Sequence, residues 1–326
     1  MGQADLSTPF PWFGGKRRVA SLVWQRFGDV QNYVEPFAGS LAVLLGRPQP
    51  FRGSETVNDR DGFVANFWRA LQADPDGLAA AADWPVNECD QHARHAWLVG
   101  QRETLTAKLE GDPSYYDVKI AGWWVWGIGV WIGAGWCAGD GPWRVNDAGQ
   151  LVHLGNTGQG VHRQLVHLGN AGQGEEGLRA WMQALADRLR RVRVCCGDWT
   201  RVCGPTPTVK QGLTAVLLDP PYSDAERTGE LYAVDDGTVA THVGAWAREW
   251  GDDPRMRIAL CGYDGEHELP GWLSVPWKNH GGYGSQGEGR GRANASREVI
   301  WFSKFCLRPD RGLFASLDEQ HREMTT

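Results

Sequence analysis

The sequence predicts an α/β fold built on a mostly parallel sheet that is interrupted once. Short apolar runs alternate with helix-like stretches, and this alternation is typical of parallel sheets covered by helices. Between about residues 76 and 176 the alternation stops, which indicates an insertion. The expected strands are 32–36, 55–58, 192–196, 215–219, 256–261, 272–275 and 298–303, and the expected helices are 60–73, 91–109, 178–190 and 239–250.

The most informative stretch is Asp219-Pro220-Pro221-Tyr222, which follows the apolar run 215–218. An apolar run closed by Pro-Pro indicates a buried strand that stops at the carboxyl edge of a sheet. The exocyclic amine of a flat base becomes a nucleophile when two acceptors hold its hydrogens, and Asp219 and the Pro220 carbonyl can do so while Tyr222 stacks on the base. Taken alone, the four residues favour a Pro-rich turn with a helix-capping Asp.

A second pattern lies at the first strand-to-helix turn, in residues 33–46. Gly39 allows the backbone to approach a ligand closely there, although the turn lacks the dinucleotide G-x-G-x-x-G fingerprint. About twenty residues later the second expected strand ends in Asp59, at the position where such sheets hold a ribose diol. Upstream, residues 11–16 form a turn that places an aromatic ring and a cation near this edge.

Together these stretches resemble the Dam-type DNA adenine-N6 methyltransferases, in the order of that family's motifs. The sequence departs from the family's pattern at the acid position, where Asp61 is a second candidate beside Asp59 for binding the cofactor's ribose. The matching stretches are Trp12 to Lys16 (W-x-G-G-K), Val34 to Gly39 (V-E-P-F-x-G), Asn58-Asp59 (D-I-N), Gly197-Asp198-Trp199 (G-D-[FW]), Leu218 to Tyr222 (D-P-P-Y), and 292–303, which is similar to the closing segment of phage-type members.

The resemblance implies a Rossmann-like S-adenosylmethionine-dependent methyltransferase sheet with an inserted target-recognition region. Residues 1–75 and 177–326 would form the catalytic domain, and residues 76–176 the insertion. The implied reaction is methyl transfer from S-adenosylmethionine to the N6 amine of an adenine that is flipped out of double-stranded DNA. The sulfonium donor carries its own activation, so no metal is expected.

The resemblance also implies a role for each site residue. Asp219, Pro220 and Tyr222 would be catalytic, and Pro221 would contact the substrate. Asp59 would bind the ribose and Asp198 the adenine amine of the cofactor. The rest of the cofactor site would comprise Trp12, Lys16, Glu35, Phe37 and Gly39.

Other functions remain open at this point. The same residues can methylate the N4 amine of cytosine or act on RNA, and the motif order favours adenine in DNA by resemblance only. A non-catalytic DNA-binding protein that retains the fold is a further alternative, although such a protein has no need of the acceptors in 219–222. Restriction-modification and a phage origin accord with the resemblance.

The net charge of −6 is the wrong sign for a protein that coats nucleic acid. An enzyme that releases its DNA can instead gather basic groups on one face. The Gly-rich segment 278–297 has this character, and we expect Arg290 and Arg292 within it to contact DNA. The alternative is a solvated loop.

Seven cysteines, an odd number without a C-x-x-C pair, indicate a reduced protein with no zinc site. His92 and His95 could share a helix face, but no further ligands accompany them. The start of the chain has no apolar signal segment. We therefore expect a cytoplasmic protein of a bacterial or phage-infected cell, monomeric and not bound to membranes.

Residues 120–139 form an uncharged run that is long enough to cross a bilayer. Five tryptophans are spread along this run instead of gathering at its ends, and its glycines weaken a helix. We therefore expect a buried core segment rather than a membrane span.

A near-exact repeat, 150–160 and 164–174, lies inside the insertion. Each copy offers a short strand and a Gly-Asn turn, so a hairpin with Arg163 near its tip is expected. Arg163 would then contact DNA, and structural padding is the alternative.

Overall fold

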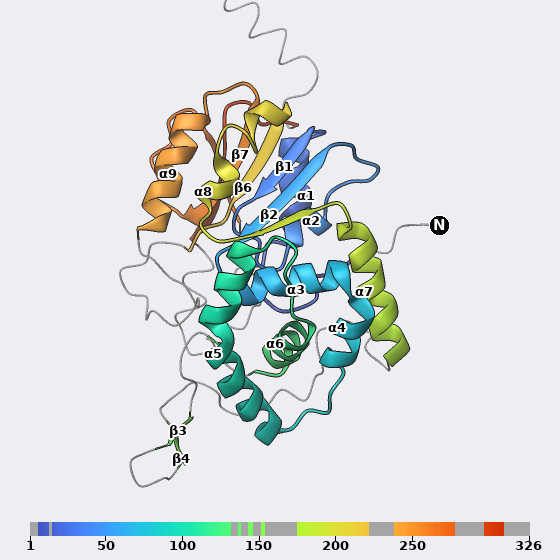
Figure 1. Cartoon of the computed structure of the whole chain (residues 1–326). Helices are drawn as coiled ribbons and strands as arrows, with labels where there is room; N and C mark the ends of the chain where they lie inside the picture. Colours follow the sequence, from blue (N-terminus) through green and yellow to red (C-terminus); the bar gives the residue numbers. More distant parts are fainter. Residues whose placement is uncertain are drawn as a thin grey trace, which may run out of the picture.

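The computed structural model is a mixed α/β protein with one large sheet and a layer of helices at one end of it (Figure 1). All seven predicted strands are present in the large sheet. The structure describes residues 6–12, 15–131, 136–137, 143–145, 151–153, 175–221, 238–277 and 297–309.

The large sheet has the strand order β5-β2-β1-β6-β7-β9-β8. Pairing is parallel from β5 through β7, whereas β9 runs antiparallel to both β7 and β8. The strands are β1 (Asn32–Glu35), β2 (Ser54–Asp59), β5 (Arg193–Cys196), β6 (Thr214–Leu218), β7 (Met256–Tyr263), β8 (Leu273–Pro276) and β9 (Glu298–Phe302).

Helices cover both faces of this sheet. Along β6, Ala215 and Leu217 join the core on the side of α1 and α2, while Val216 and Leu218 join the core on the side of α8 and α9. This alternation explains why β6 is a continuous apolar run, since a strand buried on both faces has no polar side. The helices are α1 (Ala20–Phe27), α2 (Ala42–Leu45), α8 (Thr200–Cys203), α9 (Val239–Trp250) and the 3-10 turn η2 (Val209–Gln211).

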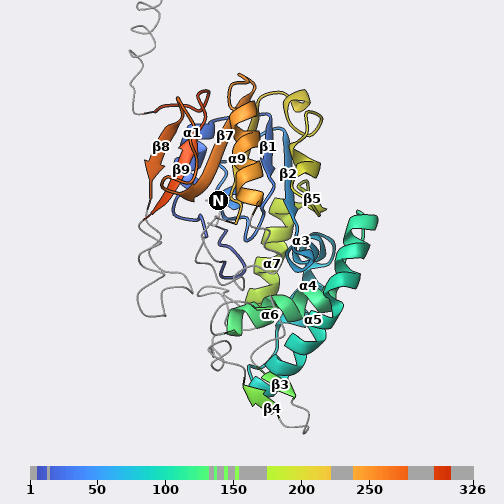
Figure 2. The ribbon, with the colours of Figure 1, turned by 90° about the vertical axis from the view of Figure 1, so that its left-hand side faces the viewer.

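The remaining helices form a layer at one end of the sheet, as both views show (Figures 1 and 2). The layer draws on the predicted insertion and also on α3 and α7, which the sequence assigns to the catalytic segments. Arg69 of α3 ties the layer to the sheet, because its side chain donates to the carbonyls of Val194 in β5 and Leu109 in α5. The helices are α3 (Gly62–Ala73), α4 (Pro75–Ala82), α5 (Glu88–Gly111), α6 (Val118–Val130) and α7 (Glu175–Leu189).

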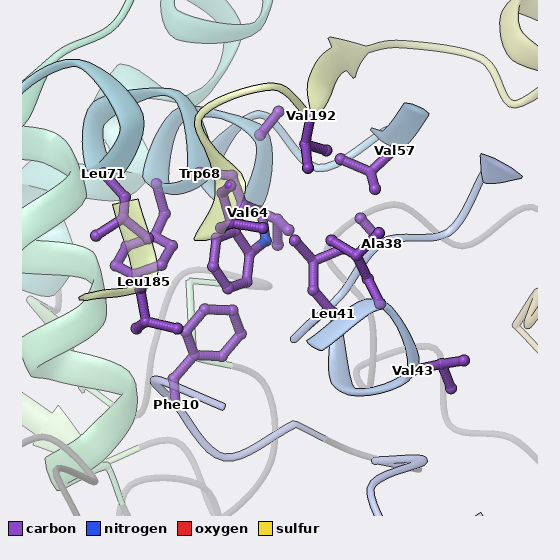
Figure 3. Packing of buried hydrophobic residues seen from close by; sticks show 14 of the residues in the cluster. Phe10, Ala38, Leu41, Val43, Val57, Val64, Trp68, Leu71, Leu185 and Val192 are labelled. Atoms are coloured by element: carbon purple, nitrogen blue, oxygen red, sulfur yellow. The ribbon is translucent and has the colours of Figure 1, made fainter. Parts of the chain in front are cut away.

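One continuous core joins the layer to the sheet (Figure 3). Phe10 of the N-terminal segment is buried against the rings of Phe67, Trp68 and Trp124. Trp68 also donates its indole N–H to the Gly39 carbonyl at 2.9 Å. The helical layer therefore fixes the turn that follows β1.

The described residues of the tryptophan-rich run, 120–131 and 136–137, are mostly buried as expected, but the first part of the run is a regular helix, α6. The expectation that glycines weaken a helix here missed their packing role. A Cβ on Gly122 would lie 2.3 Å from Cβ of Ala81 in α4, and one on Gly127 would lie 1.8 Å from the Trp136 ring. Glycine thus allows close helix packing, which offsets its low propensity. Among the described helices, none is both long and apolar enough to span a membrane.

The first copy of the repeat contributes β4 (Leu151–His153), as predicted. Its antiparallel partner is β3 (Trp143–Val145), which precedes it in the sequence. The second copy and Arg163 lie outside the described residues.

The packing of Gly122 can be tested with a second helical glycine as the control. Gly122→Ala should lower the free energy of unfolding by about 1–3 kcal/mol, because the added methyl group overlaps α4. Gly100→Ala, on the exposed side of α5 with no atom within 4 Å of the new Cβ, should raise it by up to about 1 kcal/mol. Equilibrium denaturant unfolding measures both. Equal effects of the two substitutions would contradict the close packing of α4 and α6.

Candidate active site

Most of the predicted site residues that the structure describes lie where β1, β2, β5 and β6 end, at one edge of the sheet. Val34 of β1 pairs with Val216 of β6, so the two chains leave the sheet side by side. From β1 the sheet grows through β2 to β5, and from β6 it grows through β7 in the opposite direction. Such a reversal opens a crevice at the carboxyl ends of the strands, which is where parallel α/β sheets bind ligands.

The turn after β1 has the geometry of a ligand cradle. Gly39 has φ 45°, in the left-handed region that favours glycine. A Cβ at this position would lie 2.4 Å from the indole nitrogen of Trp12, so the predicted aromatic side chain does lie over the glycine turn. The Gly39 N–H donates to Oδ2 of Asp59 at 2.9 Å, which connects the ends of β1 and β2.

Asn58 ties a third strand end to these two. Its buried side-chain amide donates to the carbonyls of Pro36 at 3.1 Å and Gly197 at 3.0 Å. Gly197 also donates its backbone N–H to the Asp59 carbonyl. The turns after β1, β2 and β5 are therefore held by one side chain.

The structure separates the two acids that compete for the ribose role. Asp61 caps α3, because its carboxylate accepts the Phe63 N–H at 2.9 Å. Asp59 lies at the end of β2 and faces the glycine turn. Burial and the nearby Asp61 raise the pKa of Asp59 to about 7, although backbone N–H groups of Gly39, Asp61 and Arg60 lower it in part.

Asp198 and Phe37 lie on the β5 side of the crevice. Asp198 is exposed and accepts the Thr200 N–H at the start of α8. The Phe37 ring stacks on Trp199, with the ring centroids 6.3 Å apart. This places an aromatic wall and an acid next to the turn that carries Gly39.

Asp219 follows β6 and forms an ion pair that sequence reasoning did not anticipate. Nζ of Lys16 lies 2.8 Å from Oδ1 of Asp219, and the two side chains are 5% and 23% exposed. Burial by itself would lower the pKa of Lys16, but Asp219, Cys261 and Glu298 together raise it above its usual value. A buried ammonium thus fixes one oxygen of the predicted catalytic carboxylate.

The structure describes only part of the Asp-Pro-Pro-Tyr motif. Pro220 is buried and Pro221 is half-buried, directly after Asp219. Tyr222 lies outside the described residues, as do Arg163, Arg290 and Arg292. The roles predicted for these four residues stay predictions.

Glu35 is buried at the end of β1, and its carboxylate has partners within the protein. The Tyr33 hydroxyl donates to Oε2 of Glu35 at 2.9 Å. Burial raises the pKa of Glu35 to about 8, the Tyr33 hydrogen bond opposes this, and the charge of Asp219 raises it further. The interaction with Asp219 shows that the acids after β1 and β6 belong to one electrostatic cluster.

Two residues of this cluster, Glu298 and Trp277, were missed by the sequence analysis. Glu298 begins β9, and its charge interacts with those of Lys16 and Asp219. The Trp277 ring centroid lies 5.2 Å from Nζ of Lys16. The available signal was an acid placed at the first position of an otherwise apolar strand.

Metal ligation finds no support in the described part of the chain. It contains no group of three or more His, Cys, Asp or Glu residues placed to hold a metal ion. All seven cysteines are free.

The fold and this edge together define a class of protein. A mostly parallel sheet with a glycine turn after β1, an acid after β2 and Asp-Pro-Pro after β6 is the arrangement of an S-adenosylmethionine-dependent amino methyltransferase. The sequence model of the D12 class N6 adenine-specific DNA methyltransferase family matches residues 12–94. This match confirms the family predicted from the motifs. No curated protein matches the chain.

The family implies S-adenosylmethionine-dependent methylation of the N6 amine of adenine in DNA. The matched stretch carries Trp12, Lys16, the Gly39 turn and Asp59, all of them residues predicted to bind the cofactor. Asp219 lies beyond the match, and its role rests on the geometry of the crevice.

The state of Asp59 gives a test by pH. Its pKa of about 7 means that the carboxyl is protonated below neutrality and ionised above it. The ionised form is the stronger acceptor for ribose hydroxyls, so cofactor affinity should rise as the pH passes upward through 7. Asp59→Asn should weaken binding about tenfold or more and remove this pH dependence.

Calorimetric titration with S-adenosylmethionine at several pH values measures the effect. Asp61→Asn is the matched control, since asparagine also caps helices. It should keep the pH dependence but move its midpoint to lower pH, because the charge of Asp61 raises the pKa of Asp59. If Asp61→Asn removes the dependence while Asp59→Asn keeps it, Asp61 is the ribose acid.

Proposed function

We propose that this sheet edge transfers a methyl group to the N6 amine of adenine at a specific site in double-stranded DNA, with Asp219 as the catalytic acceptor. The observation that supports this most strongly is the position of Asp219. It follows β6 at the strand-order reversal, next to the turn after β1, and an ion pair with Lys16 fixes it. A substrate amine at Asp219 would lie beside a cofactor held by that turn.

The residues of the Gly39 turn fit S-adenosylmethionine. A side chain on Gly39 would fill the space against Trp12, so only a bare backbone leaves a cradle there. Trp12 and Phe37 would flank the cofactor, Asp59 would accept the ribose hydroxyls, and Asp198 would accept the adenine amine. Glu35 and Lys16 lie at the methionine end of this arrangement. When bound, the cofactor supplies an electrophilic methyl group on a sulfonium.

On the substrate side, Asp219 and the Pro220 carbonyl would accept the two hydrogens of the target amine. The nitrogen lone pair then points at the methyl group, and this orientation is the main catalytic contribution of the protein. Tyr222 would stack on the flipped base and offset part of the few kcal/mol that unstacking costs. Pro221 would border the same pocket.

The reaction leaves the amine nitrogen with one proton too many. The nitrogen lone pair forms the new bond to carbon, and the carbon–sulfur bond breaks with its electron pair on sulfur. Asp219 is the carboxylate placed to accept the released proton. Before the substrate binds, the ion pair with Lys16 holds that carboxylate in position.

The alternatives differ from this proposal in what they require of Asp219. A non-catalytic DNA-binding protein has no use for a carboxylate held by a buried ammonium at the strand end. A cytosine-N4 enzyme would use the same acceptors, but the family match favours adenine. We further propose that the protein acts as a monomer in the cytoplasm, with residues 76–176 as the target-recognition region.

Replacing Asp219 tests the proposal directly. Asp219→Ala should abolish methyl transfer and leave S-adenosylmethionine affinity within a few fold, because this carboxylate faces the substrate amine. Incubation with DNA and cofactor, nuclease digestion and mass analysis of the nucleosides measures the product and distinguishes adenine from cytosine. Asp187→Ala, exposed on α7, is the control. Retained turnover in Asp219→Ala would rule out the assigned role.

The DNA-binding role predicted for the basic segment 278–297 calls for a separate test. Arg290→Ala with Arg292→Ala should weaken binding to all duplexes alike, because arginines on phosphates position the enzyme without reading sequence. The slope of log affinity against log salt should fall by roughly one unit for each phosphate that the variant no longer neutralises. Fluorescence anisotropy over a salt series measures this. An unchanged slope would show that the two arginines do not bind phosphates.

A further inference from the structure

We propose that Glu298 is a positioning residue for methyl transfer, whose carboxylate takes over the Lys16 ammonium when the target amine engages Asp219. This inference rests on the proposed function. It assigns a role to a residue that is not among the predicted site residues, in a strand that runs opposite to β1, β2 and β6.

The antiparallel direction of β9 brings Glu298 to the active-site edge. β9 pairs with β7 so that Glu298 lies beside Tyr263, at the carboxyl end of β7. The Glu298 carbonyl accepts the Trp277 N–H at 3.0 Å, which fixes the backbone here from the other side. The first residue of an antiparallel strand thus lies among the last residues of the parallel ones.

The Glu298 side chain is buried without a full set of partners. The residue is 7% exposed, and among the described residues its Oε2 has no hydrogen-bond partner. Burying an ionised carboxylate costs several kcal/mol unless a cation or donors compensate it. Lys16 is the cation whose charge acts on Glu298.

Lys16 is suited to serve two carboxylates. Its ammonium carries three donors on a flexible stem, so it can move between neighbouring acceptors without a backbone change. In the structure Nζ bonds Asp219 and lies 5.2 Å from the ring centroid of Trp277, whose backbone N–H bonds the Glu298 carbonyl. Movement of Nζ from Asp219 to Glu298 would release Oδ1 of Asp219 for the substrate amine.

A comparison with Glu55 shows what a purely structural buried glutamate looks like in this protein. Glu55 is the second residue of β2, at the opposite edge of the sheet, and both of its oxygens are paired. Arg47 lies 3.1 Å from Oε1, and Arg188 lies 2.8 Å from Oε2. Glu298 is similarly buried, but among the described residues its Oε2 has no hydrogen-bond partner and can still accept a bond from Lys16.

The movement of the Lys16 ammonium from Asp219 to Glu298 should depend on pH. Burial raises the pKa of Glu298 to about 7; Lys16 lowers it in part and Asp219 raises it. The charged and titratable groups that act on this cluster are Lys16, Asp219, Cys261 and Glu35. Below neutrality Glu298 is protonated and cannot take Lys16, so the chemical step should accelerate as the pH rises through 7. Glu35 has a pKa of about 8, so its titration is centred higher.

Single-turnover methylation at saturating DNA and cofactor, followed across the neutral pH range, tests the inference. Glu298→Gln keeps the size of the side chain and removes its charge. We expect a rate about tenfold to hundredfold lower and loss of the rise near pH 7. Cofactor affinity by calorimetry should stay at the wild-type value. Glu298→Asp should keep the rise, and Glu268→Gln, an exposed acid, should match the wild type in every respect.

A double-mutant cycle separates an effect through Lys16 from a loss of packing. If Glu298 acts through Lys16, Lys16→Gln with Glu298→Gln should be no slower than Lys16→Gln alone. Additive losses would overturn the inference, as would a Glu298→Gln enzyme that keeps the pH rise. If Glu298→Gln does not fold, loss of the rise in Glu298→Asp overturns the inference and its retention supports it.

The same assay distinguishes this failure from failure of the proposed function. An active wild type with an inactive Asp219→Ala, together with an unaffected Glu298→Gln, overturns only the role of Glu298. A wild type that forms no N6-methyladenine overturns both.

Discussion

Strands β1 and β6 lie side by side, although the chain builds the sheet outward from each of them in opposite directions. The turns after the two strands therefore leave toward different sides and cannot fill the space between them. Every functional assignment depends on this constraint. It places the cofactor turn after β1 beside the acceptors after β6, residues almost two hundred positions apart in the sequence. No local interaction could bring them together.

Backbone polar groups at this edge are satisfied by side chains instead of by further strands. The amide of Asn58 bonds two carbonyls, and the carboxylate of Asp59 accepts the N–H groups of Gly39 and Asp61. Trp68 adds a bond from the helical layer. A glycine turn without such bonds would sample many conformations, and its cradle would then form only at an entropic cost. Part of the rigidity of the turn is thus supplied by Asn58 and Trp68, which need not touch a ligand.

The sequence was sufficient to predict the strands and the residues that follow them at this edge, because each of those features is local. The strand-like runs, and the residues Gly39, Asp59 and Asp219 that follow them, can be recognised directly in the sequence. The pairing of Lys16 with Asp219 joins distant segments and has no local signal. Glu298 was missed for a related reason, since only the antiparallel direction of β9 brings its first residue to this edge. Helix α6 was misjudged because the packing partner of Gly122, Ala81, lies in another helix.

Buried carboxylates pair with different cations at the two edges of the sheet. This difference distinguishes a link that stabilises the fold from one that serves the reaction. At the amino end of β2, Arg47 and Arg188 neutralise Glu55 completely and join α7 to the sheet. Arg188 binds both oxygens of Glu55, and such a bidentate pair holds one geometry, which suits a permanent link. At the carboxyl edge Asp219 pairs with the flexible ammonium of Lys16, whose charge also acts on Glu298. Since a lysine can exchange acceptors at little cost, the ion pair at this edge can be remade during a reaction while the one at the opposite edge holds the fold.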